Sequence, residues 1–438
     1  MLREENEMLT RIGPDTPMGE VMRRYWMVAA LSSDLPEPDC APIRVKLLGE
    51  DLVAFRDSKG RVGLLDEFCP HRQASLFLGR TEDCGLRCIF HGWKFDVEGN
   101  CVEMPNELPE NDFKDKVHVK TYQTLELGGA IWAYMGPEYK IPAPPKFEWT
   151  QVPETHRHVS KTVQECNWLQ ALEGGIDGSH SSFLHRSLTT DVARSRAGLS
   201  ASGYRGRSTA PRQEMDQTDY GLLFASIRPL GEEGNYVRTY HFVMPFYEVR
   251  ADQVGTGGEV KRKVITGHFW VPMDDENCMV YNWMYSFGDE PLSKDMLAFM
   301  EWGAGRAPED LLPDSRNIRN RSNNWLIDRQ YQKTKSFAGI EGINSQDFAV
   351  QESMGPIVDR TKEHLGPSDR VIIMARRMLL QAVKTVQEGG DPPGVSPSYY
   401  RIRAIERLLP NGVEWHEALK EEIEAPRTGQ LDNRPGAA

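Results

Sequence analysis

The pattern of hydrophobic and polar positions is helical at the start of the chain. Residues 10–30 show the spacing of a short amphipathic helix, with Asp15 or Thr16 available as its cap and Pro17 in its first turn. We therefore expect an N-terminal helical segment over residues 1–37.

From about residue 40 the period changes to two. Apolar and polar residues alternate in short runs, and turn signals separate the runs at Gly49-Glu50-Asp51, Ser58-Lys59-Gly60 and Glu98-Gly99-Asn100. This pattern predicts short antiparallel strands and a small all-β domain over residues 38–140. Residues 136–154 contain five prolines and are typical of an extended connection, which favours a domain boundary there.

The remainder of the chain mixes both periods. Residues 164–187 have helical content, and residues 200–290 return to strands. Five later stretches are predicted to be helical: 295–305, 322–333, 345–354, 367–388 and 398–407. We expect an α+β domain built on an antiparallel sheet over residues 141–424. The tail, 425–438, has the composition of a disordered segment.

Composition narrows the functional class. The net charge of −12 argues against a nucleic-acid surface. No run of ~18 apolar residues predicts a membrane span, and the charged N-terminus lacks the apolar core of a signal peptide, so we expect a cytoplasmic protein without membrane partners. Seven cysteines in such a chain favour metal binding over a disulfide framework where they lie close to histidines.

Cysteine and histidine do cluster in one segment. Cys69-x-His71 and Cys88-x-x-His91 each supply one thiolate and one imidazole, and 16 residues separate the two pairs. The spacing is compatible with a structural zinc site or with a Rieske [2Fe–2S] centre, in which two Cys hold one iron and two His the other. Cys84 lies outside this template and is interpreted as a free loop cysteine.

The residues around these ligands favour the second alternative. CPHR at 69–72 and CIFHGWKFD at 88–96 resemble the Rieske motif of ring-hydroxylating oxygenases. The resemblance implies a [2Fe–2S] cluster held by Cys69, His71, Cys88 and His91. Respiratory Rieske proteins carry two further cysteines that form a disulfide, and Ala74 and Phe90 stand at the corresponding positions. The resemblance therefore implies the lower part of the Rieske range of potentials, ~−150 to +300 mV, and electrons that come from NADH.

A second cluster lies in NWLQALEGGIDGSHSSFLHR, residues 167–186. On an ideal helix His180 and His185 would point ~140° apart, so a shared metal requires the helix to bulge or break near residues 178–182. Without a shared metal, they would be two ordinary histidines on a partly buried helix.

Resemblance to the same family makes the shared metal the favoured interpretation. It implies a mononuclear Fe(II) bound by His180, His185 and one carboxylate, with open positions for O2. GINSQDFAVQESMGPIVDR, 342–360, resembles the segment that supplies the carboxylate; we choose Asp347, with Glu341 and Glu352 as rivals and a solvated helix acid as the alternative. The resemblance also implies that Asp177 links His180 by hydrogen bonds to His91 of a neighbouring subunit.

Nearly the whole chain resembles the phthalate dioxygenase branch of this family. One difference is that Glu173 and Gly174 stand where many relatives have an Asp and an Asn. The branch implies a helix-grip, START-like catalytic domain, a homotrimer or hexamer, and a flavin reductase with a ferredoxin domain that oxidises NADH. The implied reaction is hydroxylation of a phthalate- or benzoate-type aromatic carboxylate, by cis-dihydroxylation. O-demethylation of a methoxylated aromatic acid is the nearest alternative, and a non-catalytic zinc-bound binding protein is a remote one.

An aromatic carboxylate needs a cationic partner in its pocket, and Arg suits this role. Four arginines lie in the predicted sheet region: Arg205, Arg207, Arg212 and Arg238. We favour Arg207 and Arg238 as substrate-binding residues, against the alternative that each is an exposed strand or loop residue. Phe242, Phe246 and Trp270 are expected either to line the pocket or to belong to the core.

Overall fold

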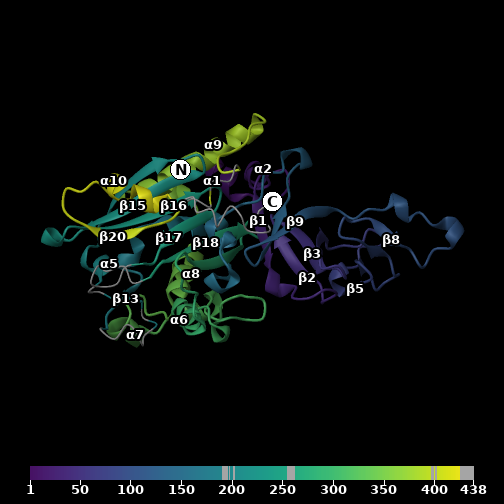
Figure 1. Ribbon diagram of the computed structural model, residues 1–438, viewed down its shortest axis with the longest axis horizontal. Coiled ribbons are helices and arrows are strands. Elements are labelled where there is room, and N and C mark those ends of the chain that lie inside the picture. The colour runs from purple at the N-terminus through teal and green to yellow at the C-terminus, as the bar shows by residue number, and fades with distance from the viewer. Residues whose placement is uncertain are drawn as a thin grey trace. The chain divides into compact units, whose positions relative to one another are not determined.

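A computed structural model describes residues 1–189, 196, 198–200, 203–253, 262–395, 399 and 402–424 (Figure 1). Contacts divide the chain into two units. The β unit comprises Ile12–Pro142 and Pro272–Asp274, and the α+β unit comprises Met1–Arg11, Ala143–Val271 and Asp275–Ala438. The predicted tail, 425–438, lies outside the described residues.

The β unit contains two antiparallel sheets, as the alternating pattern predicted. Its larger sheet has the order β1-β10-β9-β4-β3-β2, with the strands β1 (Trp26–Leu31), β2 (Ile43–Leu47), β3 (Glu50–Arg56), β4 (Val62–Asp66), β9 (Thr121–Leu127) and β10 (Ala130–Tyr134). Its smaller sheet joins β5 (Arg80–Glu82), β6 (Gly85–Arg87), β7 (Lys94–Phe95) and β8 (Cys101–Glu103) in sequence order. Leu48 and Gly49 both have positive φ in the turn between β2 and β3, the conformation that a two-residue hairpin favours.

The helix predicted over residues 10–30 is only partly present. Thr16 caps α2, which runs over Pro17–Met22 and ends there. Residues Trp26–Leu31 form strand β1, every residue of which is buried, and this strand pairs with β10. A fully apolar run gives no period by which a strand can be told from a helix, so the continuous-helix prediction was wrong for these residues.

The α+β unit is built on an antiparallel sheet with the order β11-β19-β18-β17-β16-β15-β14, and β20 pairs with β16. Its strands are β11 (Arg157–Gln164), β14 (Arg212–Gln217), β15 (Gly221–Pro229), β16 (Asn235–Val243), β17 (Tyr247–Ala251), β18 (Val264–Pro272), β19 (Cys278–Ser286) and β20 (Glu406–Leu409). A parallel pair of two-residue strands, β12 (Arg186–Ser187) and β13 (Leu199–Ser200), lies apart from it.

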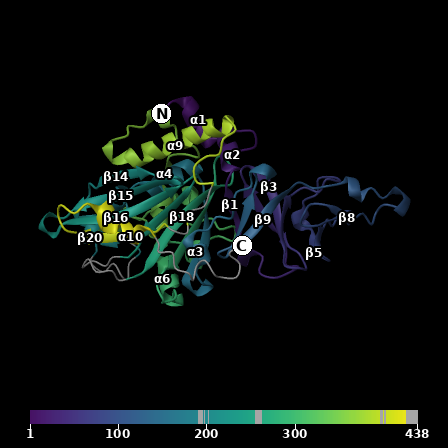
Figure 2. The same ribbon diagram turned by 45° about the horizontal axis from the view of Figure 1, so that its top comes forward.

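Helices accompany this sheet. They are α1 (Arg3–Thr10), α3 (Glu148–Gln151), α4 (Trp168–Ile176), α5 (Tyr204–Arg207), α6 (Lys294–Ala304), α7 (Arg329–Thr334), α8 (Ile343–Ser353), α9 (Arg370–Gln387) and α10 (Trp415–Ile423). Figure 2 shows α9 lying across β14 and β15 beside α1, and α9 buries an apolar stripe that includes Val371, Leu379 and Val383. No helix among the described residues has both the length and the apolar character needed to cross a bilayer.

Two details at the C-terminal end differ from expectation. The helix predicted over 398–407 is not found where the structure describes this stretch, because Glu406–Leu409 form β20. The helix α10, Trp415–Ile423, was not predicted, and it covers the sheet through Trp415, Leu419 and Ile423. An edge strand with alternating charges, as in RIRAIERLL, has too few residues to distinguish the two periods.

Candidate metal centres and active-site cavity

Two similar tight turns carry the four ligands predicted in the β unit. Cys69 follows β4, and its carbonyl accepts a hydrogen bond from Gln73 N–H at 2.9 Å; Cys88 follows β6, and its carbonyl accepts one from Gly92 N–H at 3.0 Å. Gly92 has φ +80°, and a Cβ there would lie 2.6 Å from Pro105 Cγ, so this turn requires glycine. Each turn therefore presents one thiol and one imidazole.

The four side chains of these turns lie together. Cys69 and Cys88 are buried, with 2% and 3% exposure, and their thiols form a hydrogen bond with each other. That hydrogen bond, with the backbone N–H groups of Phe90 and His91, lowers the pKa of Cys88 to about 6, whereas the pKa of Cys69 is raised. The His71 and His91 rings are 4.4 Å apart between centroids.

These side chains fit a two-iron cluster. Each cysteine has a large effect on the pKa of the other, so the two thiols are neighbours that could share an iron. Among the described residues, His91 Nδ1 is buried without a hydrogen-bond partner. The His71 ring is held by stacking on Trp93, with 4.4 Å between centroids and 8° between planes.

Cys84 is a free cysteine in a loop, as expected. Cys84 is half-buried in the turn between β5 and β6, and Cys101 is buried in β8, where burial raises its pKa to about 11. All seven cysteines are free thiols, and Ala74 and Phe90 offer no sulfur for a disulfide beside the ligand turns.

In the α+β unit, helix α4 ends before the two histidines, so the predicted break is present. The helix ends at Ile176; Asp177 then accepts a hydrogen bond from Ser179 N–H at 2.7 Å, and a 3₁₀ turn follows over His180–Ser182. Side chains such as Asp177 compete in this way with helical hydrogen bonds. The end of the helix frees His180 and His185 from the helical spacing that would separate them.

The buried Arg228 of β15 fixes the backbone at this break. Its Nη2 donates to the Gly178 carbonyl at 2.5 Å and its Nε to the Ser208 carbonyl at 3.1 Å. A Cβ at Gly178 would lie 2.1 Å from Ser226 Oγ, so the segment approaches the sheet closely. Sequence reasoning missed this role of Arg228.

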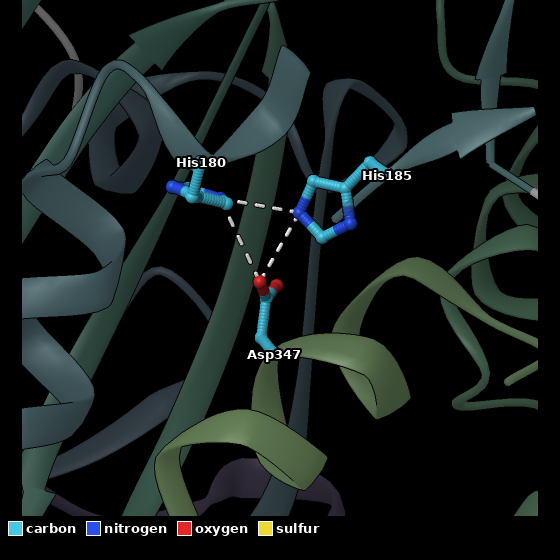
Figure 3. A group of neighbouring side chains, drawn as sticks. All are labelled: His180, His185 and Asp347. Atoms are coloured by element: carbon cyan, nitrogen blue, oxygen red, sulfur yellow. Dashed lines mark hydrogen bonds and ion pairs between the residues drawn. The ribbon is translucent and has the colours of Figure 1, made fainter. Parts of the chain in front are cut away.

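His180, His185 and Asp347 meet at one point (Figure 3). His185 Nε2 is 3.2 Å from His180 Nε2 and 3.1 Å from Asp347 Oδ1, and His180 Nε2 is 3.6 Å from the same oxygen. Neighbouring ligands of one ion at a metal–ligand distance of ~2.1 Å are ~3 Å apart, so this donor set fits a 2-His-1-carboxylate site.

The neighbours of the imidazoles keep Nε2 available. His185 Nδ1 donates to Gln346 Oε1 at 2.8 Å, and Gln346 Nε2 in turn donates to the Ile340 carbonyl. His180 Nδ1 lies 3.5 Å from Asp177 Oδ2. Burial disfavours the charged form of His180, but Asp177 and Asp347 outweigh it and raise the pKa of His180. Gln346 was not predicted, although it precedes Asp347 directly.

The rival carboxylates lie elsewhere. Glu352 accepts hydrogen bonds from Trp325 Nε1 at 2.7 Å and from Glu165 N–H at 3.2 Å. The half-exposed Glu341 lies 3.4 Å from Arg319 Nη2. Neither belongs to the group formed by the two histidines and Asp347.

A cavity of about 330 Å³ contains all three members of that group. Arg205 and Arg238 line this cavity, and so does Trp270, whereas Phe242 and Phe246 are fully buried in the core.

The prediction that Arg207 binds substrate is corrected by the structure. Arg207 is not among the residues that line the cavity; it is exposed on α5 and forms an ion pair with Glu233. Its neighbour Arg205 is the member of this short helix that reaches the cavity.

Three further cavity residues, Glu248, Arg250 and His268, were not predicted. They lie on the central strands β17 and β18. The available signal was the recurrence of charge at every second position of YEVR in an otherwise apolar sheet strand.

Comparison with family models matches both parts of the chain. Residues 25–123 match the Rieske [2Fe-2S] domain, and residues 133–435 match a domain described as "LigXa C-terminal domain like".

Curated relatives match over almost the full length. The chain is 38% identical to the 3-chlorobenzoate-3,4-dioxygenase oxygenase subunit of Comamonas testosteroni, over 97% of this chain and 99% of the relative. It is 37% identical to the phthalate 4,5-dioxygenase oxygenase subunit of Pseudomonas putida, over 94% of each chain. It is 32% identical to the 5,5'-dehydrodivanillate O-demethylase oxygenase subunit of Sphingobium sp. (strain NBRC 103272 / SYK-6), over 96% of this chain and 89% of the relative.

Among solved structures, NdmA of Pseudomonas putida CBB5 has a similar fold. The TM-score is 0.60 at 18% identity, over 87% of this chain and 96% of that one.

Proposed function

Because the chain belongs to the Rieske non-heme iron ring-hydroxylating oxygenases, as an oxygenase subunit, we propose that its substrate is an aromatic carboxylate of the phthalate or benzoate type. The proposed reaction is cis-dihydroxylation of the ring with O2. The observation that carries this proposal is the convergence of His180, His185 and Asp347 on one point of a cavity lined by arginines, in a chain whose relatives include 3-chlorobenzoate and phthalate dioxygenases.

We assign the cluster ligands Cys69, His71, Cys88 and His91 to a domain over residues 38–140. The mononuclear iron ligands His180, His185 and Asp347 belong to a domain over residues 141–424. When bound, the cluster supplies single electrons, and the mononuclear iron supplies the activation of O2. The chain itself orients the ligands: Gln346 hydrogen-bonds the ring of His185, and Asp177 Oδ2 lies 3.5 Å from Nδ1 of His180.

Asp177 has a second proposed role, as the hydrogen-bonded link between His180 and His91 of a neighbouring subunit. Its place beside His180 supports this role, and its side chain is 22% exposed and thus accessible to a partner. The role requires a homo-oligomer, which we propose to be a trimer or a pair of stacked trimers. We further propose that a separate flavin reductase with a ferredoxin domain passes electrons from NADH in the cytoplasm. The relatives are named as oxygenase subunits, which supports a multicomponent system.

A second candidate reaction is O-demethylation of a methoxylated aromatic acid. The match to an O-demethylase oxygenase subunit over 96% of this chain favours it specifically. Both reactions use the same ligands and differ in which substrate atom lies next to the iron site.

The test is turnover by the iron-loaded protein with a reductase and NADH. Phthalate, 3-chlorobenzoate and 4-methoxybenzoate are supplied separately, and products are identified by mass spectrometry with ¹⁸O2. A diol that carries both labelled oxygen atoms supports the dioxygenase, and formaldehyde release from 4-methoxybenzoate supports the second candidate. Asp347→Ala is the control for uncoupled NADH oxidation. If NADH is consumed equally with and without every acid and no oxygenated product forms, the proposed substrate class is wrong.

A further inference from the structure

Three polar side chains gather on the face of the sheet that lines the cavity. Glu248 and Arg250 lie two residues apart on β17 and so point to the same face. The register pairs Glu248 with His268 and Arg250 with Thr266 on β18. Arg250 and His268 are therefore diagonal neighbours, ~7–8 Å apart at the backbone, a separation that a small ligand group can bridge between their side chains.

The guanidinium of Arg250 makes only weak contacts with the protein. Its Nε donates to Thr266 Oγ1 at 3.3 Å and its Nη1 to Glu248 Oε2 at 3.4 Å, both at the long end of the hydrogen-bond range. Among the described residues no acceptor lies within hydrogen-bond distance of Nη2. Removal from water lowers the pKa of Arg250, which shows that the charge is poorly compensated where it lies.

His268 is 3% exposed, and among the described residues neither ring nitrogen has a partner in good hydrogen-bond geometry. Asn282 lies close enough to raise its pKa slightly, but it does not satisfy the ring. Burial, with the charges of Arg250 and Arg306, holds the pKa of His268 well below its usual range, so the ring is neutral and offers one N–H donor. A buried polar group without a partner is costly, and such groups on a cavity wall are suited to hydrogen-bonding a ligand.

Two other arginines of the cavity, Arg238 and Arg306, are already occupied by protein acceptors. All three guanidinium nitrogens of Arg238 donate to protein acceptors: Nε and Nη2 to the Ala251 carbonyl, and Nη1 to Tyr240 Oη. Arg306 is similarly occupied by Glu301, Asn282 and Asn344. Arg205 lines the cavity from the short helix α5, not from the sheet.

We propose that Arg250 and His268 bind the carboxylate of the substrate, with Glu248 and Thr266 orienting the guanidinium. This assignment rests on the proposed aromatic-acid function and moves the predicted carboxylate contact from Arg207 and Arg238 to Arg250. Arg250, His268 and Asp347 line one cavity, so the carboxylate-binding residues and the proposed iron site share it.

The test measures binding without turnover. Oxidised, iron-loaded protein is titrated by calorimetry under argon with benzoate, phthalate, 3-chlorobenzoate and 4-methoxybenzoate, and with the neutral amide of each. The wild-type protein is expected to bind at least one acid ~10- to 100-fold more tightly than its amide, the range for a hydrogen-bonded charged group. In Arg250→Gln this ratio is expected to fall to about one, and in His268→Phe the acid is expected to bind ~5- to 10-fold more weakly.

Control variants distinguish carboxylate binding by Arg250 from binding by other arginines. Arg207→Gln removes an exposed arginine and is expected to keep the ratio, and the visible spectrum of the cluster checks the fold of every variant. Should Arg250→Gln fail to fold, Arg250→Lys decides, because lysine keeps the charge without the planar fork and is expected to lower the ratio several-fold. The proposal would be overturned if the ratio were unchanged in the Arg250 variants, or if it were lost in Arg205→Gln or Arg238→Gln instead. It would also be overturned if the wild type did not prefer the acid. If the protein bound the acid through Arg250 but formed no oxygenated product, the proposed function would be refuted. The assignment of Arg250 as the carboxylate-binding residue would still hold.

Discussion

Replacement of Glu352 by glutamine tests both the ligand assignment and the electrostatics of the helix that carries Asp347. Glu352 is 3% exposed near the end of α8, and its carboxyl accepts hydrogen bonds from Trp325 Nε1 and from Glu165 N–H. Burial raises the pKa of Glu352 to about 7, because the loss of hydration outweighs these hydrogen bonds. The folded protein thus binds this proton more tightly than the unfolded chain does.

The magnitude follows from this pKa. An acid whose pKa rises on folding contributes its full stabilisation below the unfolded value of 4.5, and the contribution is lost as the pH rises through about 7. At ~1.4 kcal/mol per unit of pKa, the loss by pH 8.5 is ~3 kcal/mol. Glutamine does not titrate, but its amide nitrogen cannot accept one of the two hydrogen bonds, which costs ~1 kcal/mol. By pH 5 about 0.8 kcal/mol of the linked stabilisation is already lost, because this pH lies above the unfolded pKa. Glu352→Gln should therefore be about as stable as the wild type at pH 5 and ~2 kcal/mol more stable at pH 8.5.

The assay is thermal unfolding, followed by circular dichroism at both pH values, together with iron analysis. The variant is expected to have a Tm close to that of the wild type at pH 5, a higher Tm at pH 8.5, and the iron content of the wild type. Glu341→Gln, which removes an exposed carboxylate, controls for net charge. A Tm difference of the same size at both pH values would refute the argument from burial. Loss of one iron in Glu352→Gln would show that Glu352, not Asp347, is the third ligand.

Three further outcomes follow from the two metal centres. Asp347→Asn is expected to lower the iron content from about three to about two per subunit, by metal analysis, while the visible spectrum of the cluster persists. Asp177→Asn is expected to retain both spectrum and iron but to lose turnover ~100-fold or more, in steady-state assays with reductase; turnover near the wild-type level would exclude the proposed link to His91. Cys88→Ser is expected to abolish the cluster absorption, whereas the matched variant Cys84→Ser should keep it; equal loss in both would contradict the ligand assignment.

The first cluster could be predicted from the sequence because its chemistry is local. Each pair of ligands lies in one tight turn, so spacing alone brings a thiol beside an imidazole. The requirement for glycine at position 92 is local as well, because the positive φ of Gly92 and its contact with Pro105 arise within the same small domain region. The choice between zinc and a two-iron cluster was not readable from spacing, and it depended on resemblance in the flanking residues.

The cavity could be predicted only in part, because segments that are far apart in the sequence come together to line it. Asp347 comes from a helix far along the chain, and no periodicity distinguishes it from Glu341 or Glu352. The choice of Arg207 failed because α5 turns that side chain to the surface, beside Glu233. The pair Glu248 and Arg250 was overlooked because a strand with alternating charges normally has a solvated face. Here that face lines the cavity.

The break after α4 connects two of the proposed iron ligands to the sheet that lines the cavity. Five-residue spacing puts His180 and His185 on different faces of any helix, so the sequence excludes a continuous helix if both bind one ion. The fold meets this condition with Arg228, a fully buried cation that donates to the Gly178 carbonyl. In the part of the chain that the structure describes, its Nη1 has no partner. Burial of such a charge is costly, and it lowers the pKa of Arg228. Because Arg228 belongs to β15, a strand of the sheet whose face lines the cavity, its hydrogen bond to Gly178 connects the His180 segment to that sheet. The cavity wall and the proposed iron ligands are therefore supported by the same sheet.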